Sequence, residues 1–189
     1  MTLIVAFGNK ARSGKDTAVS AIVDYYNRQR ELQRAYGLKT VGPVVQRIGF
    51  ADALYEVCRA EYGMTEKDAP LLQKVGATRR EEDPEYWIKR AFAKIDANTN
   101  IVLIPDCRYK NEATYVKDQG GYVVNVQHLT PHGNPFIAED RPMNHQSEVD
   151  LDNWNWDFRL VNQHGHEALL CEQAITLVEY LRGLHVAAA

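Results

Sequence analysis

The chain has 189 residues and a mass of 21.5 kDa, which suits one domain over residues 1–189 with a single sizeable core. Its formal net charge is -3 and its charged residues are interspersed, so nothing indicates a general polyanion-binding protein. The three cysteines lie far apart, without zinc-site spacing, which favours reduced thiols in a cytoplasmic protein. No apolar run approaches the roughly 18 residues of a membrane span, and we expect no membrane partner.

Residues 3–17, LIVAFGNKARSGKDT, combine a short apolar run, a loop of small and basic residues and a helix start. This order is typical of a P-loop, whose backbone N–H groups wrap a phosphate while the following helix directs its positive end at the same anion. The side chain of Lys15 is expected to reach the outer phosphates. The residues predicted to bind the phosphates of ATP alongside it are Asn9, Lys10, Ala11, Ser13, Gly14, Asp16 and Thr17.

Two positions depart from the usual P-loop pattern GxxxxGK[ST]. Asn9 stands where the first glycine is expected and Gly8 comes one residue earlier, so the loop either tolerates Asn in a turn or carries an extra residue. Asp16 stands where Ser or Thr usually contacts Mg²⁺, so a metal would be held through Asp16, Thr17 or water. A strand-to-helix turn without any ligand is the alternative interpretation.

Apolar periodicity predicts the other elements of the chain. We expect a helix from 14 to about 34, a strand over 44–50, a helix from 50 through 58, helices between 65 and 97 separated at Gly76 and 78–83, a strand over 101–106, a helix over 111–119, a strand over 122–128, a final strand through 154–162 and a helix over 165–184. This order predicts a three-layer α/β fold with a parallel sheet of about five strands. Ligands of such sheets bind at the carboxyl ends of the strands.

Charged residues follow two of these strands. Asp106 ends an apolar run, as in the Walker-B pattern, where an acid beside the P-loop orients Mg²⁺ or its waters. Arg108 is expected to point from the same loop into the cleft. Asp52 follows the strand over 44–50 and is either a helix N-cap or a ligand contact. In the helical segment 52–97, cations and an aromatic ring form a grouping that could hold a phosphate and a base, although exposed cations on helices usually only solvate a surface: Gln73, Arg79, Arg80, Trp87, Lys89 and Arg90.

Residues 130–147 hold two histidines, three prolines and mixed charges without periodicity. A long irregular loop in a compact domain is usually functional or disordered. In a phosphotransferase it would be a lid that closes over the donor, with Arg141 as its only arginine. The three tryptophans are expected in the core or the cleft wall rather than in a nucleic-acid stacking platform, because no basic stripe interleaves them.

Five segments resemble, in this order, the phage-type deoxynucleoside monophosphate kinases: GNKARSGKDT, IGFADALYE, LQKVGATRREEDPEYWIKR, IVLIPDCRYKNEATYVKDQGG and HQSEVDL…DFRLVNQHGHEAL. GKDT and the D-x-R-x-x-N-E run are the most specific parts. The resemblance implies transfer of the γ-phosphoryl group of ATP to a deoxynucleoside monophosphate, with Mg²⁺. It further implies that Lys15 and the loop amides hold the donor phosphates, and that Arg12 and Arg108 neutralise charge on the transferring group.

The resemblance also implies roles on the acceptor side. Asp106 would organise the metal or orient the acceptor, Glu148 would support the site, and the acceptor contacts would be Asp52, Arg79, Trp87 and Arg90. The expected partners are nucleotides, and the expected location is the cytoplasm, that of the host cell if the chain is phage-encoded. Three alternatives stay open: another small-molecule acceptor, a modified base in phage DNA, and an ATP-binding regulator without phosphotransfer. The base and the oligomeric state, a homodimer included, do not follow from the sequence.

Overall fold

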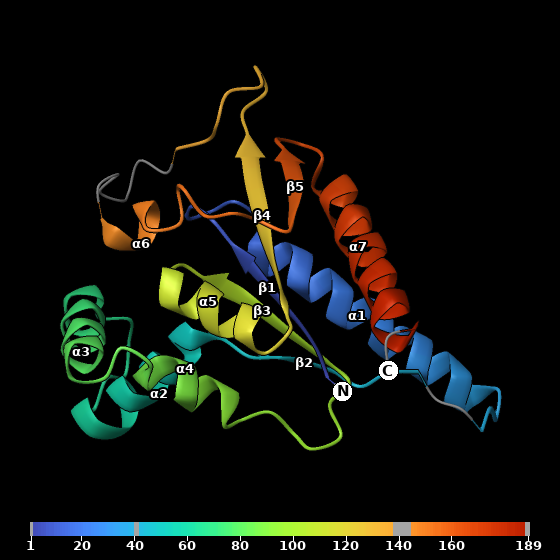
Figure 1. Cartoon of the computed structure of the whole chain (residues 1–189), viewed down its shortest axis with the longest axis horizontal. Coiled ribbons are helices and arrows are strands. Elements are labelled where there is room, and N and C mark those ends of the chain that lie inside the picture. Colours follow the sequence, from blue (N-terminus) through green and yellow to red (C-terminus); the bar gives the residue numbers. More distant parts are fainter. Residues whose placement is uncertain (1, 40–41, 138–144, 188–189) are drawn as a thin grey trace.

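The computed structural model describes residues 2–39, 42–137 and 145–187. Its strands form one parallel sheet with the spatial order β2-β3-β1-β4-β5 (Figure 1). The strands are β1 (Leu3–Gly8), β2 (Val45–Arg47), β3 (Ile101–Cys107), β4 (Tyr122–Leu129) and β5 (Phe158–Gln163). The central strands are continuous apolar runs because helices cover both faces of the sheet. The predicted three-layer α/β fold with a five-stranded parallel sheet is confirmed.

The helices divide between the two faces of the sheet (Figure 1). On one face, α1 (Lys15–Ala35) packs against α7 (Glu167–Ala187). The other face is covered by α2 (Phe50–Tyr62), α4 (Tyr86–Phe92) and α5 (Lys110–Asp118). Helix α3 (Ala69–Glu82) packs on α2 and α4, and together these three form a helical insertion beside the sheet. The short α6 (Gln146–Val149) follows β4.

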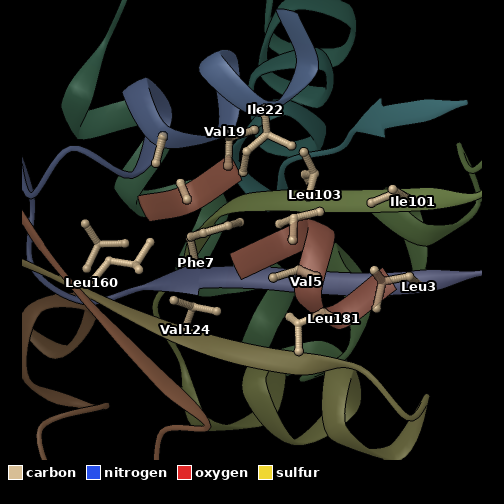
Figure 2. Close-up of a cluster of buried hydrophobic side chains, with 14 of the residues drawn as sticks. Leu3, Val5, Phe7, Val19, Ile22, Ile101, Leu103, Val124, Leu160 and Leu181 are labelled. Atoms are coloured by element: carbon tan, nitrogen blue, oxygen red, sulfur yellow. The ribbon is translucent and has the colours of Figure 1, made fainter. Parts of the chain in front are cut away.

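Alternating side chains of β1 divide the main core into two clusters. Val5 and Phe7 pack with Ile22 of α1 and the inner side of α7 (Figure 2). Ile4 and Ala6 point to the opposite face, where α4 and α5 cover them. Since β1 is buried on both faces, the loop that leaves its carboxyl end starts from a rigid base.

The helical segment between residues 65 and 97 is divided at a different point from the one predicted. Helix α3 continues through Gly76, and the break lies at residues 83–85, which include Pro84. The predicted separation at Gly76 and 78–83 was wrong, because Gly76 is buried within α3 and the helix continues to Glu82. Arg79 and Arg80 therefore lie on a helix and not on a loop.

Three other boundaries differ from the prediction. β2 covers only 45–47 of the expected strand, and β5 begins at Phe158 because Trp154 and Trp156 pack against the second core cluster ahead of it. The expected lid over 130–147 ends in helix α6, while its residues 138–144, with Arg141, lie outside the described residues. In the described part of the chain, no helix combines the length and apolarity needed to cross a membrane.

Candidate active site

The loop between β1 and α1 turns on three residues with positive φ angles, Asn9 (110°), Arg12 (56°) and Gly14 (98°). Gly14 is the N-cap of α1, and a Cβ there would lie 2.8 Å from the side chains of Asn162 and Leu170. Glycine is therefore required for both its φ angle and its size. Asn9 takes the turn position at which the P-loop pattern expects its first glycine.

Lys15 is buried beneath this loop, with 4% of the residue exposed. Its ammonium group donates to the carbonyl oxygens of Lys10 at 2.5 Å and Asn9 at 3.2 Å, and to the hydroxyl of Ser13 at 2.9 Å. Burial, with the positive charge of Arg108, lowers the pKa of Lys15 to about 7. Anionic phosphates next to the ammonium group would stabilise its charged form and raise this pKa.

Two buried asparagines on neighbouring strands support the loop. Asn125 of β4 accepts a hydrogen bond from the side-chain amide of Asn9 at 2.7 Å. Asn162 of β5 donates to the carbonyl oxygen of Ser13 at 3.2 Å. Sequence reasoning missed both residues, although each asparagine directly follows apolar residues of its strand, in VVN and LVN. Each contributes to the shape of the loop rather than to its ligand-facing groups.

Asp106 lies near the end of β3, where the Walker-B pattern predicts an acid. Its carboxylate accepts from the backbone N–H groups of Phe50 at 3.1 Å and Ala51 at 2.7 Å, in the first turn of α2. Burial raises the pKa of this carboxyl group against the opposing effect of these two hydrogen bonds. Asp106 thus ties the central sheet to the beginning of the helical insertion.

Arg108 and Glu148 form an ion pair of 2.6 Å with side chains 21% and 8% exposed. The second carboxylate oxygen of Glu148 accepts from the backbone N–H of Ala11 at 2.8 Å. The ammonium group of Lys10, a predicted phosphate ligand, contacts the Glu148 carbonyl and the carboxylate of Asp152. Glu148 therefore joins the P-loop to the loop that carries Arg108.

Glu112 fixes the loop of Arg108 from its other side. The residue is 3% exposed, and one carboxylate oxygen accepts from the N–H groups of Arg108 at 2.8 Å and Tyr109 at 3.1 Å. Burial raises the pKa of Glu112 to about 8. Glu112, the last residue of the D-x-R-x-x-N-E run, thus helps to position Arg108 of the same run.

Arg47 joins the starts of two helices and was not predicted as a site residue. Its guanidinium group pairs with Asp52 at 2.5 Å and with Asp16 at 3.4 Å. Asp52 lies in the first turn of α2, whose N-cap is Gly49, so the interpretation of Asp52 as an N-cap was wrong. The pairing places a cation between the P-loop helix and the insertion.

A cavity of about 1050 Å³ opens between the P-loop helix, the insertion and α6. Its wall includes Asp16, Asp52, Asp106 and Glu148 and four cationic side chains: Arg47, Lys67, Arg80 and Arg108. Within the part of the chain that the structure describes, Lys67 and Arg80 form no ion pair, although the charge of Arg80 opposes the rise that burial causes in the pKa of Glu112. The guanidinium group of Arg80 lies over the ring of Tyr109, 4.3 Å from its centroid, a contact that orients the cation beside the cavity.

Trp87, predicted to contact the acceptor, belongs to the core of the insertion. It is 2% exposed, and its indole N–H donates to the carbonyl oxygen of Gly76 at 3.2 Å. It packs with Ala53, Val57 and Leu72 in a third apolar cluster. This ring is buried with its polar atom satisfied and lies outside the cavity wall, so the prediction of an acceptor contact was wrong.

The two predicted acceptor arginines of the insertion lie outside the cavity wall. Arg79 pairs with Glu61 and Glu82, each at 3.1 Å. Arg90 lies over the ring of Tyr86, 5.5 Å from its centroid. Because α3 turns by about 100° per residue, Arg79 and Arg80 face different sides. Arg80, and not the predicted Arg79, therefore reaches the cavity.

The predicted metal-binding residues occupy different positions. In the described ranges, no group of three or more Asp, Glu, His or Cys side chains is arranged to hold a metal ion. Mg²⁺ is usually held by one or two carboxylates together with substrate phosphates and water. Asp16 and Asp106 both line the cavity and fit such a site, whereas Thr17 does not line it. Arg12 is also exposed, at the turn of the loop.

No protein-family model and no curated protein matches this sequence. Three solved structures are similar over most of their length: an APS kinase of Mycobacterium tuberculosis (15% identity, TM-score 0.47, 95% of this chain and 96% of that one), a shikimate kinase of Bacteroides thetaiotaomicron (12%, 0.44, 95% and 97%) and a sugar kinase of Janibacter (13%, 0.39, 95% and 95%). Similarity at this distance assigns neither a family nor a substrate. The chain's own strand order, with a phosphate-type loop after β1, establishes an α/β fold with a five-stranded parallel sheet.

Proposed function

We propose that the protein transfers the γ-phosphoryl group of ATP to a deoxynucleoside 5′-monophosphate, giving ADP and the diphosphate, with Mg²⁺. One observation carries this proposal: the cavity beside the P-loop offers two cations, Lys67 and Arg80, that form no ion pair among the described residues. Cations available in a cavity suit a phosphorylated acceptor. The cavity volume of about 1050 Å³ lies slightly above the usual range for small-ligand sites, about 300–1000 Å³.

On the donor side, phosphoryl transfer asks mainly for positioning and for stabilisation of negative charge. Lys15 and the loop N–H groups would hold the donor phosphates. Arg108, oriented by Glu148, would neutralise the transferring group, and Arg12 is a second candidate for that role. Bound Mg²⁺ would neutralise charge on the phosphate oxygens, with Asp16 and Asp106 as the residues that hold it directly or through water.

On the acceptor side, Arg80 and Lys67 would bind the phosphate of the monophosphate. The rings of Tyr55 and Tyr109 also line the cavity and offer apolar surface for a base. Gln73 lines the same wall, and its amide can both donate to and accept from the edge of a base. These residues support a nucleotide acceptor without choosing among the bases.

An acceptor with a hydroxyl group, such as a modified base in DNA, is the second candidate. Phosphorylation of a hydroxyl group benefits from a carboxylate base. Two carboxylates lie close to Gly49, where a Cβ would be 2.6 Å from Asp52 and 3.2 Å from Asp106. However, Asp52 is paired with Arg47 and Asp106 accepts two backbone hydrogen bonds, which weakens both as bases.

The test is an ADP-release assay with ATP and Mg²⁺ against dAMP, dGMP, dCMP, dTMP and modified monophosphates, with single-stranded and duplex DNA alongside. Two neighbouring arginines give a matched pair of variants. Arg80→Ala is expected to raise the KM for the monophosphate about tenfold or more, because it removes a charge-assisted contact. Arg79→Ala should leave this KM within about twofold, since its partners lie outside the cavity.

Each result decides between the candidates. Release with one or more monophosphates, weakened by Arg80→Ala alone, supports the proposal. Release only with DNA would move the acceptor onto the polymer. Stoichiometric ATP binding without ADP release from any acceptor would identify a nucleotide-binding regulator and overturn the proposed transfer.

A further inference from the structure

The P-loop of this chain uses its first two residues for different purposes. Gly8 provides space, because a Cβ there would lie 2.8 Å from the ring of Trp156 and 2.9 Å from the carbonyl oxygen of Cys107. Asn9 provides the turn, with a φ angle of 110°. A side chain at positive φ is unfavourable for any residue except glycine, and least so for Asn or Asp, whose short polar side chains can form supporting hydrogen bonds.

The contacts of Asn9 supply that support. Its side-chain amide donates to Oδ1 of Asn125 at 2.7 Å and to the carbonyl oxygen of Val126 at 3.3 Å. Asn125 is 8% exposed, and the parallel pairing of β1 with β4 aligns it with Gly8, the residue before Asn9. The acceptor is therefore fixed by a central strand of the sheet and does not depend on the loop itself.

We propose that Asn125 is a positioning residue of the phosphate loop: it holds Asn9 at positive φ and lets asparagine replace the first glycine of the P-loop. The carbonyl oxygen of Asn9 accepts from the ammonium group of Lys15, so the same contact also sets one of the lysine's oxygen partners. This inference rests on the proposed phosphate-binding role of the loop. It predicts that the need for Asn125 disappears once residue 9 is glycine.

A double-mutant cycle in the full chain tests this dependence. The variants are Asn125→Ala, Asn9→Gly and the two combined, and the probes are Mg·ATP and inorganic tripolyphosphate, which reports on the loop without a base. Asn125→Ala is expected to weaken binding of both probes about five- to tenfold, the usual effect of one lost buried hydrogen bond. Asn9→Gly is the reference background for the combined variant, since glycine adopts the turn without support.

The affinity of the combined variant for the two probes decides the test. Binding restored to within about twofold of Asn9→Gly supports the proposal, because a purely structural loss at β4 would persist in both backgrounds. Asn162→Ala is the matched control, since Asn162 is also a buried strand asparagine bonded to the loop but contacts Ser13. Asn9→Gly should not restore its binding. Equal weakening by Asn125→Ala in both backgrounds would overturn the proposal.

Failure of the proposed function is distinguishable from failure of this inference. If the wild-type protein binds neither probe, the phosphate-binding role fails, and the same cycle is measured on thermal unfolding midpoints. If Asn125→Ala lowers the unfolding midpoint in the wild-type background but not in the Asn9→Gly background, the role of Asn125 in the loop is still supported. A fall of the same size in both backgrounds would overturn it.

Discussion

The P-loop side of the cavity and the helical insertion hold their charged groups in different ways. On the P-loop side, Lys15 is buried among loop oxygens and Arg108 is paired with a buried carboxylate. On the insertion side, Arg80 lies over an aromatic ring and Lys67 has no acidic partner in the described chain. The P-loop side thus fixes its cations among oxygen partners, whereas the insertion side holds two cations outside ion pairs, where the proposed acceptor would contact them.

The largest effect is expected on the P-loop side. Replacing Lys15 with Ala should lower turnover about a thousandfold, because the ammonium group acts on developing phosphate charge in a site shielded from water. The fold should persist, since burial lowers the pKa of Lys15 and charging this side chain opposes folding. ADP release and thermal unfolding measure the two effects. Lys89→Ala, at an exposed paired lysine, is the control, and unchanged turnover in Lys15→Ala would refute the phosphate role.

On the insertion side, the largest effect should concern stability. Trp87→Ala is expected to cost about 3–5 kcal/mol, as is usual for a buried aromatic side chain. Trp87→Phe should retain most of the packing, and its KM for the acceptor should remain close to wild type. Urea unfolding and steady-state kinetics measure both variants. A KM raised tenfold in a stable Trp87→Phe protein would return this residue to the acceptor site.

The donor side could be predicted from the sequence because its parts are local. A strand, a loop and a helix start within 15 residues place Lys15, and one strand end places Asp106. The asparagines that shape the loop were missed, since Asn125 and Asn162 reach it only through the order of β1, β4 and β5. Strand order is a property of tertiary structure that periodicity alone does not contain.

The acceptor side was predicted less well for a physical reason. The rotation of a helix decides which of two adjacent residues faces a cavity. Arg79 and Arg80 were predicted to lie in a break between helices, so this rotation could not be considered. Trp87 has an aromatic ring of the kind that stacks on bases. The packing of α2, α3 and α4 buries this ring, and the sequence does not reveal that packing. Arg47 is exposed at a strand end, and only the fold brings Asp16 and Asp52 to it.

A smaller effect tests the coupling between the two loops on the donor side. Glu148→Gln keeps an oxygen that can accept from the N–H of Ala11 but removes the negative charge opposite Arg108. Turnover should fall about tenfold, as expected when an oriented cation loses a charge-assisted hydrogen bond, while the Kd for ATP stays within about twofold. Asp152→Asn is the control, because this exposed acid contacts Lys10 and touches neither Arg108 nor Ala11. If Glu148→Gln turns over like wild type, Arg108 does not depend on Glu148 for its position.

The smallest effect expected is the uptake of a proton by Lys15, on the P-loop side of the cavity, when ATP binds. No such uptake is expected on the insertion side. In the nucleotide-free protein, burial lowers the pKa of Lys15 to about 7 from the ordinary 10.5. The unfolded chain therefore holds more protons between these values, so stability rises as pH rises from about 7 to 10.5 and is lost again as pH falls back to about 7.

Binding reverses this balance, because donor phosphates favour the ammonium form of Lys15. ATP binding at pH 8 should take up nearly one proton, measured by calorimetry in buffers of different ionisation enthalpy, and binding at pH 6 should take up almost none. Lys15→Arg should abolish the uptake, since its guanidinium group stays charged. The same uptake in Lys15→Arg would assign the proton to another group, whereas its loss would show that the buried lysine is charged by its ligand.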